Sequence, residues 1–134
     1  MMIHNEKSTK WINMFNNKFE EFIKDLILLY PEDSDFKTMK SSFNMLKIVD
    51  EKKPIEMFIS YGQKYKEMVE NKNESFFLQH DYKTELELVD TQNITDEIIG
   101  RLKAYWISTN DSNKDTIWKY LQLLYKIIDK LNNK

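Results

Sequence analysis

The chain has 134 residues, enough for one domain built around one hydrophobic core. Hydrophobic residues make up 41% and aromatic residues 13%, which excludes an intrinsically disordered chain, and two glycines with two prolines leave few turns for β-hairpins. Charged residues reach 31% but nearly cancel to a formal net charge of −2, so no overall basic excess indicates a nucleic-acid partner.

The first predicted helix runs from Ser8 or Thr9 to Tyr30, after a frayed tail over residues 1–7 that has no apolar signal sequence. Apolar residues recur on one face of this helix at spacings of three or four: Trp11, Phe15, Phe19, Phe22, Leu26 and Leu29. Pro31 ends the helix, because a proline pushes the residue before it out of the helical region.

An acidic turn over residues 31–35 comes next, and Asp33, Ser34 or Asp35 can cap the second helix. The second helix ends near Asp50. It carries a narrow apolar stripe made of Phe36, Met39, Phe43 and Leu46.

A third helix begins at Pro54 and continues to about Val69, with Gly62 inside its apolar face. Glycine costs about 1 kcal/mol relative to alanine in a helix, so we expect another helix to approach closely at this point. Residues 75–82 form a short helix or turn whose aromatic side chains fill the core. For residues 85–93, helix, strand and loop all stay open.

A fifth helix begins at Asn93 or Thr95, and a polar loop over residues 108–113 separates it from a sixth helix, which runs from about Lys114 to Leu131. The apolar positions of the sixth helix span roughly 220° of the helical wheel. So wide an arc places a helix at the centre of a bundle or under a partner. We therefore expect a partner-binding surface, including a homodimer contact, at Tyr120, Leu123, Ile127 and Leu131.

Together these elements predict an all-α fold, a compact bundle of five to six helices in a single domain over residues 1–134. The sixth helix is central or lies at an interface. The longest apolar run, Leu26 to Tyr30, is far too short to cross a membrane, so we expect a soluble intracellular protein.

The sequence predicts no metal site, no cofactor and no enzymatic activity. The chain has no cysteine, which excludes disulfides and thiolate ligands. The spacing of His80, Asp81 and Glu85 matches no metal-binding motif. An acid–base site built from His80 and Asp81 with Asp33 and Asp35 would need all four side chains within hydrogen-bonding reach of one another.

A lysine face on the second helix provides the alternative function, nucleic-acid binding. Its residues are Lys37, Lys40, Lys47, Lys52 and Lys53. Because Asp35, Asp50 and Glu51 interrupt the positive field, a solvated surface is the ordinary explanation of these lysines.

Three stretches of the chain carry a resemblance. They are residues 30–37 (Tyr-Pro-Glu-Asp-Ser-Asp-Phe-Lys), residues 73–78 with Asp81-Tyr82, and residues 102–106 followed by 114–120. In this order they resemble small proteins encoded by nucleocytoplasmic large DNA viruses, the giant viruses of algae and protists. The resemblance implies a viral protein in the host cell cytoplasm or the virion, and it brings no catalytic residues. The first hypothesis is therefore a non-enzymatic helical protein that acts through protein–protein contacts, as a virion component or host-interaction factor.

Overall fold

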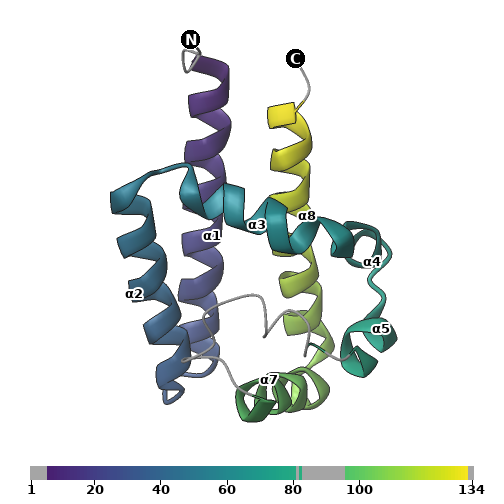
Figure 1. Ribbon diagram of the computed structural model, residues 1–134. Coiled ribbons are helices and arrows are strands. Elements are labelled where there is room, and N and C mark those ends of the chain that lie inside the picture. The colour runs from purple at the N-terminus through teal and green to yellow at the C-terminus, as the bar shows by residue number, and fades with distance from the viewer. Residues whose placement is uncertain (1–5, 81, 83–95, 133–134) are drawn as a thin grey trace.

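The computed structural model describes residues 6–80, 82 and 96–132, and within them every regular element is a helix (Figure 1). The helices are α1 (Glu6–Leu29), α2 (Ser34–Val49), α3 (Lys53–Gly62), the 3-10 turn η1 (Gln63–Tyr65), α4 (Lys66–Glu70), α5 (Glu74–Gln79), α7 (Asp96–Ser108) and α8 (Asp111–Asn132). The all-α prediction is confirmed. The open question about residues 85–93 lies outside the described residues.

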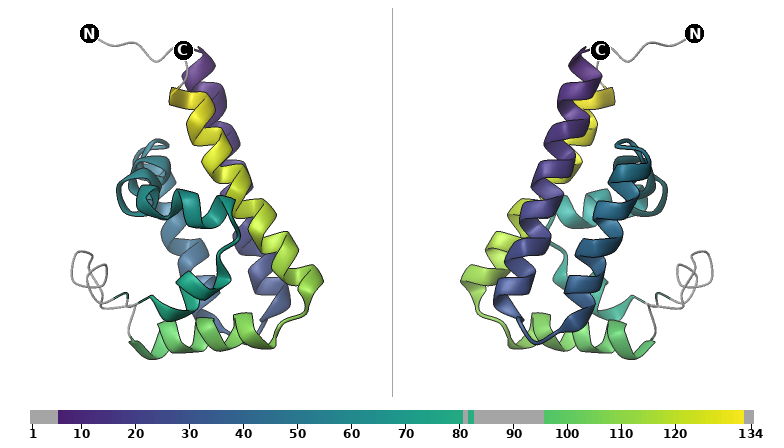
Figure 2. Two further views of the ribbon diagram at one scale, coloured as in Figure 1. Left: turned by 90° about the vertical axis from the view of Figure 1, so that its right-hand side faces the viewer. Right: turned by 90° about the vertical axis from the view of Figure 1, so that its left-hand side faces the viewer.

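The long helices α1 and α8 form the axis of the molecule and run antiparallel, side by side (Figure 1, Figure 2). Their interface contains the most deeply buried side chains, none of which is more than 4% exposed: Ile12, Phe15, Leu124, Ile127 and Ile128, with Ile55 from α3. The helix predicted sixth in the sequence, α8, is therefore central, which accounts for its wide apolar arc.

On one side of this axis, α2 packs along α1, and α3 crosses in front of the α1–α8 pair (Figure 1). The rings of Phe19 on α1 and Phe43 on α2 stack with their centroids 5.1 Å apart. Asn16 is buried, and its side-chain amide donates a hydrogen bond of 2.9 Å to the carbonyl of Glu51 between α2 and α3. A single polar side chain on α1 thus fixes where the chain turns back.

At the opposite end of the bundle from the termini, α7 lies across the turn that joins α1 and α2 (Figure 2). The ring of Tyr30, in that turn, stacks on Tyr105 of α7 at a centroid distance of 4.0 Å. This arrangement leaves α5, α7 and the first half of α8 facing one another on the other side of the axis.

The third helix is shorter than predicted and ends at Gly62, where the chain passes through η1 into α4. Gly62 has φ −107° and ψ −13°, well outside the ordinary helical values, and its carbonyl accepts a hydrogen bond from the hydroxyl of Tyr125 on α8. The expected close approach is present: a Cβ at Gly62 would lie 3.3 Å from the Tyr125 hydroxyl oxygen. Glycine at this position admits the Tyr125 hydroxyl of α8.

The last helix begins earlier than predicted, because α8 starts at Asp111 rather than Lys114. The side-chain oxygen of Asn110 accepts a hydrogen bond of 2.8 Å from the backbone N–H of Asn113, which is the geometry of a helix cap. The predicted polar loop therefore contributes its last three residues to the helix. No helix in the described part of the chain has the length and apolar character that crossing a bilayer requires.

Candidate functional site

A pocket of about 520 Å³ lies between α3, α5, α7 and α8, and its walls are almost entirely apolar. The apolar side chains that line it include Phe58, Phe77, Ile99, Leu102, Trp118 and Leu121. A volume between roughly 300 and 1,000 Å³ is typical of pockets that bind small molecules. This pocket is the main candidate for a functional site.

Two tryptophans from different helices form one wall of the pocket. The rings of Trp106 on α7 and Trp118 on α8 meet edge to face, with centroids 5.2 Å apart and an interplanar angle of 78°. Phe77 of α5 lies against Trp118 at 6.0 Å, so three helices contribute to one aromatic cluster. Such edge-to-face pairs stabilise the arrangement of the rings beyond the effect of their burial.

A carboxylate at one side of the pocket is ionised and paired with neighbouring donors. Glu74 accepts hydrogen bonds from the ammonium of Lys114 at 2.9 Å and from the indole N–H of Trp106. The hydrogen bond from Lys114 and then that from Trp106 lower the pKa of Glu74 below its ordinary value. The Lys114 ammonium also lies 5.4 Å from the centre of the Trp106 ring. This group positions the tryptophan that lines the pocket.

Two of the tyrosines that line the pocket, Tyr125 and Tyr82, donate their hydroxyl hydrogen bonds to backbone carbonyls. Tyr125, which is 4% exposed, donates to the carbonyl of Gly62, and burial raises its pKa to about 12. Tyr82 donates a hydrogen bond of 3.1 Å to the carbonyl of Phe77, and burial raises its pKa as well. Both side chains therefore present their rings to the pocket and keep their hydroxyls paired.

Lys103 of α7 is the positively charged side chain among the described residues that line the pocket. Its ammonium donates a hydrogen bond of 3.0 Å to the carbonyl of His80, which follows the last residue of α5. The ammonium also lies 5.3 Å from the centre of the Tyr82 ring. The His80 ring is 3.2 Å from the Tyr65 hydroxyl through Nε2.

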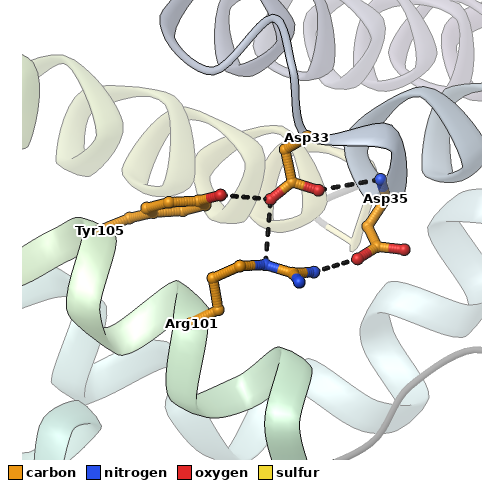
Figure 3. A network of polar contacts seen from close by, with 4 residues as sticks. All are labelled: Asp33, Asp35, Arg101 and Tyr105. Atoms are coloured by element: carbon orange, nitrogen blue, oxygen red, sulfur yellow. Dashed lines mark hydrogen bonds and ion pairs between the residues drawn. The ribbon is translucent and has the colours of Figure 1, made fainter.

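A second polar site joins the α1–α2 turn to α7 (Figure 3). Asp33 caps α2 by accepting a hydrogen bond of 2.9 Å from the backbone N–H of Asp35, as the sequence predicts. Asp33 also accepts a 2.6 Å hydrogen bond from the Tyr105 hydroxyl and lies 3.1 Å from Nε of Arg101. Arg101, the only arginine of the chain, pairs with Asp35 as well.

This clamp consists of Asp33, Asp35, Arg101 and Tyr105, and its one guanidinium lies between two carboxylates. The side chain of Asp33 is only 5% exposed, and this burial opposes its ionisation. Hydrogen bonds from Tyr105 and the Asp35 backbone, together with the Arg101 charge, outweigh the burial and lower the pKa of Asp33 below its ordinary value. A carboxylate held ionised by a cap, a hydroxyl and a guanidinium is suited to fastening α7 onto the bundle.

The acid–base site considered from the sequence divides into separate parts. Asp33 and Asp35 contact Arg101 and Tyr105, whereas His80 packs against the rings of Tyr65, Phe76 and Tyr82. Asp81 and Glu85 lie outside the described residues. Within residues 6–80, 82 and 96–132, no cluster of three or more potential metal ligands occurs.

The predicted partner surface on α8 is corrected, since its side chains contact other helices of the same chain. Ile127 is 2% exposed in the α1–α8 core, and Leu123 and Leu131 pack against that core. The Tyr120 hydroxyl donates a 2.6 Å hydrogen bond to Asp25 on α1, and its ring stacks on Phe22. The most exposed large apolar side chains include three on α2: Met45, Ile48 and Val49, at 69%, 82% and 78%.

The predicted lysine face is only partly assembled. Lys37 and Lys40 line an open groove of about 580 Å³ between α1 and α2, which also includes Lys24. Lys47 instead forms an ion pair of 3.4 Å with Glu20 on α1. Lys52 lies in the connection between α2 and α3, and Lys53 is the first residue of α3. The five lysines therefore form no single continuous binding face.

Sequence reasoning missed the pocket because its side chains show the same helical spacing as core residues. The sequence predicts that the aromatic side chains of residues 75–82, Phe77 among them, fill the core, and periodicity cannot distinguish a filled interior from a lined hollow. Comparison of the chain with protein-family models, curated proteins and solved structures found no match. The resemblance to giant-virus proteins stays a prediction.

Proposed function

We propose that this protein is a non-enzymatic binding protein that holds an apolar ligand in the pocket between α3, α5, α7 and α8. The observation that carries the proposal is the volume of about 520 Å³ with an almost wholly apolar lining. Burial of apolar ligand surface contributes roughly 25 cal/mol per Å², so a wall of this kind favours apolar groups strongly. In the setting implied by the viral resemblance, the protein would act in the host cytoplasm or the virion.

The contacts of the polar groups support binding rather than catalysis. The Glu74 carboxylate is ion-paired with Lys114 and accepts a hydrogen bond from Trp106, and the Tyr125 and Tyr82 hydroxyls donate to carbonyls. The α8 residues expected at a partner surface, Leu123, Ile127 and Leu131, belong to or pack against the core shared with α1, which favours a ligand in the pocket over a partner on that face.

The experiment uses N-phenyl-1-naphthylamine, an uncharged dye whose fluorescence rises in apolar surroundings. We expect saturable binding to the wild type and at least tenfold weaker binding to Ile99→Trp, because the larger ring fills the pocket. The matched control is Ile107→Trp on the same helix, where the isoleucine is 66% exposed. Circular dichroism verifies that both variants fold. Absence of dye binding, or equal binding by both variants, would contradict the proposal.

A further inference from the structure

Given an apolar ligand in this pocket, we infer that its natural class is a single-chain amphiphile with an anionic headgroup, whose tail lies among the aromatic walls and whose headgroup binds Lys103. The inference rests on the proposed function and adds the chemistry of the ligand. It starts from the charges at the pocket. Among the described lining residues, the charged side chains are Glu74 and Lys103.

The two charges differ in how they are matched by the protein. The Glu74 carboxylate has the Lys114 ammonium at 2.9 Å and the Trp106 indole N–H, so its negative charge is matched within the protein. The Lys103 ammonium contacts a carbonyl oxygen, at 3.0 Å, and the face of an aromatic ring. Neither group carries a full negative charge.

Lys103 also keeps capacity for a ligand. An ammonium group has three N–H donors, and the carbonyl of His80 occupies one of them. That hydrogen bond and the Tyr82 ring hold the ammonium at the pocket. A carboxylate or another singly charged headgroup could accept the remaining N–H groups and complete the charge balance.

The apolar lining of the pocket determines which kind of tail the ligand can have. Ile99 and Leu102 on α7 lie on the same helix as Lys103, and Leu121 and Trp118 on α8 lie across the pocket. An alkyl chain fits such walls because it has no polar atom that would have to lose hydrogen bonds to water. The pairing of one cation with an apolar hollow therefore favours an alkyl carboxylate over a neutral or cationic alkyl compound.

The test compares three competitors of equal chain length for displacement of N-phenyl-1-naphthylamine: decanoate, 1-decanol and decylammonium, at a pH where decanoate is ionised. For the wild type we expect decanoate to displace the dye at about tenfold lower concentration than decanol, with decylammonium the weakest. Lys103→Met should remove the preference for decanoate, measured in each protein as the ratio of the decanoate and decanol concentrations that displace half of the bound dye. Lys103→Arg should retain it, since the charge stays in place.

Lys119→Met provides the control, because Lys119 is exposed on α8 and does not line the pocket. It should behave as the wild type. Equal displacement by decanoate and decanol, or a decanoate preference that persists in Lys103→Met, would overturn this inference alone, with dye binding and the proposed function intact. Failure of the dye to bind the wild type would overturn both.

Discussion

The α1–α8 interface and the pocket use the same kinds of side chain on the same helix, but only the first is filled. Phe15 and Leu124 in the interface are fully buried, whereas Leu121, less than one turn before Leu124, is half-buried and lines a hollow of about 520 Å³. Apolar character at helical spacing therefore identifies an inward-facing position. It does not say whether the chain itself occupies the space that the position faces.

The physical reason lies in the partners of α8. In the interface it meets α1, a long continuous helix, so side chains interdigitate over many turns. At the pocket it meets short segments, because α3 ends at Gly62 and α4 ends at a turn in which Lys72 has φ 52°. Short helices that change direction cannot follow α8 closely, and space remains between them.

The largest expected effect comes from truncating one leucine in each region. Leu124→Ala should lower the free energy of unfolding by about 2–5 kcal/mol, since it opens a cavity in a filled core. Leu121→Ala should cost only about 1 kcal/mol, because the site already adjoins open space. Urea denaturation measures both. Equal losses would show that the two regions are equally well packed.

The clamp that holds α7, and with it one wall of the pocket, should make stability depend on acid pH. The pKa of Asp33 lies below its ordinary value of 3.8, so its ionised form stabilises the fold above that pH. The contribution is lost as the pH falls through the lowered pKa. Asp33→Asn keeps the helix cap and should lower the free energy of unfolding by about 1–3 kcal/mol at neutral pH. Below pH 3.8 the stability of this variant should fall less steeply with pH than that of the wild type. Urea denaturation across the acid range tests this, and the exposed control Asp115→Asn should behave as the wild type.

Two tyrosines on α8 report on the two regions at alkaline pH. The hydrogen bond to Asp25 raises the pKa of Tyr120 to about 12, and burial beside the pocket raises that of Tyr125 to about 12. Because both values are raised, their stabilisation is complete below the ordinary pKa of 10 and is lost as the pH rises through about 12.

Ultraviolet absorbance titration should therefore find Tyr120 and Tyr125 among the tyrosines that ionise only near pH 12 in the wild type. Asp25→Asn should return the pKa of Tyr120 towards its ordinary value and leave the pKa of Tyr125 raised, because the two hydroxyls have different partners. Tyr120→Phe should cost about 1 kcal/mol at neutral pH. A shift of both tyrosines in Asp25→Asn would mean that the regions are not independent.

The smallest expected effect is at the contact between α3 and α8. Alanine restricts the backbone of the unfolded chain more than glycine does, so Gly62→Ala should raise the free energy of unfolding by about 0.5–1 kcal/mol from this effect. The new methyl group, however, would lie 3.3 Å from the Tyr125 hydroxyl. We expect a net change of less than about 1 kcal/mol. In a Tyr125→Phe background the hydroxyl is gone, so Gly62→Ala should become stabilising. Thermal unfolding of the four proteins in this cycle measures the coupling, and additive effects would contradict a direct contact.

Much of the architecture was predictable from particular residues. Pro31 and Asp33 locate the end of α1 and the cap of α2, since a proline restricts its predecessor and a carboxylate pairs with free N–H groups at a helix start. The early start of α8 at Asp111 was missed, because several polar residues in succession could each have been the cap. For the clamp, the sequence offered Asp33 and Asp35, but nothing local indicated that Arg101 and Tyr105 would meet them.

The sequence by itself determined that the chain is all-α, where most of its helices begin and end, and which faces turn inward. These properties depend on interactions between residues a few positions apart, which periodicity and caps record. Only the tertiary structure decided what each apolar face meets: α1 packs against one part of the apolar arc of α8, and Trp118 and Leu121 of the same arc line a pocket. Whether a face is filled depends on the lengths and angles of helices far apart in the sequence, and no local pattern encodes those.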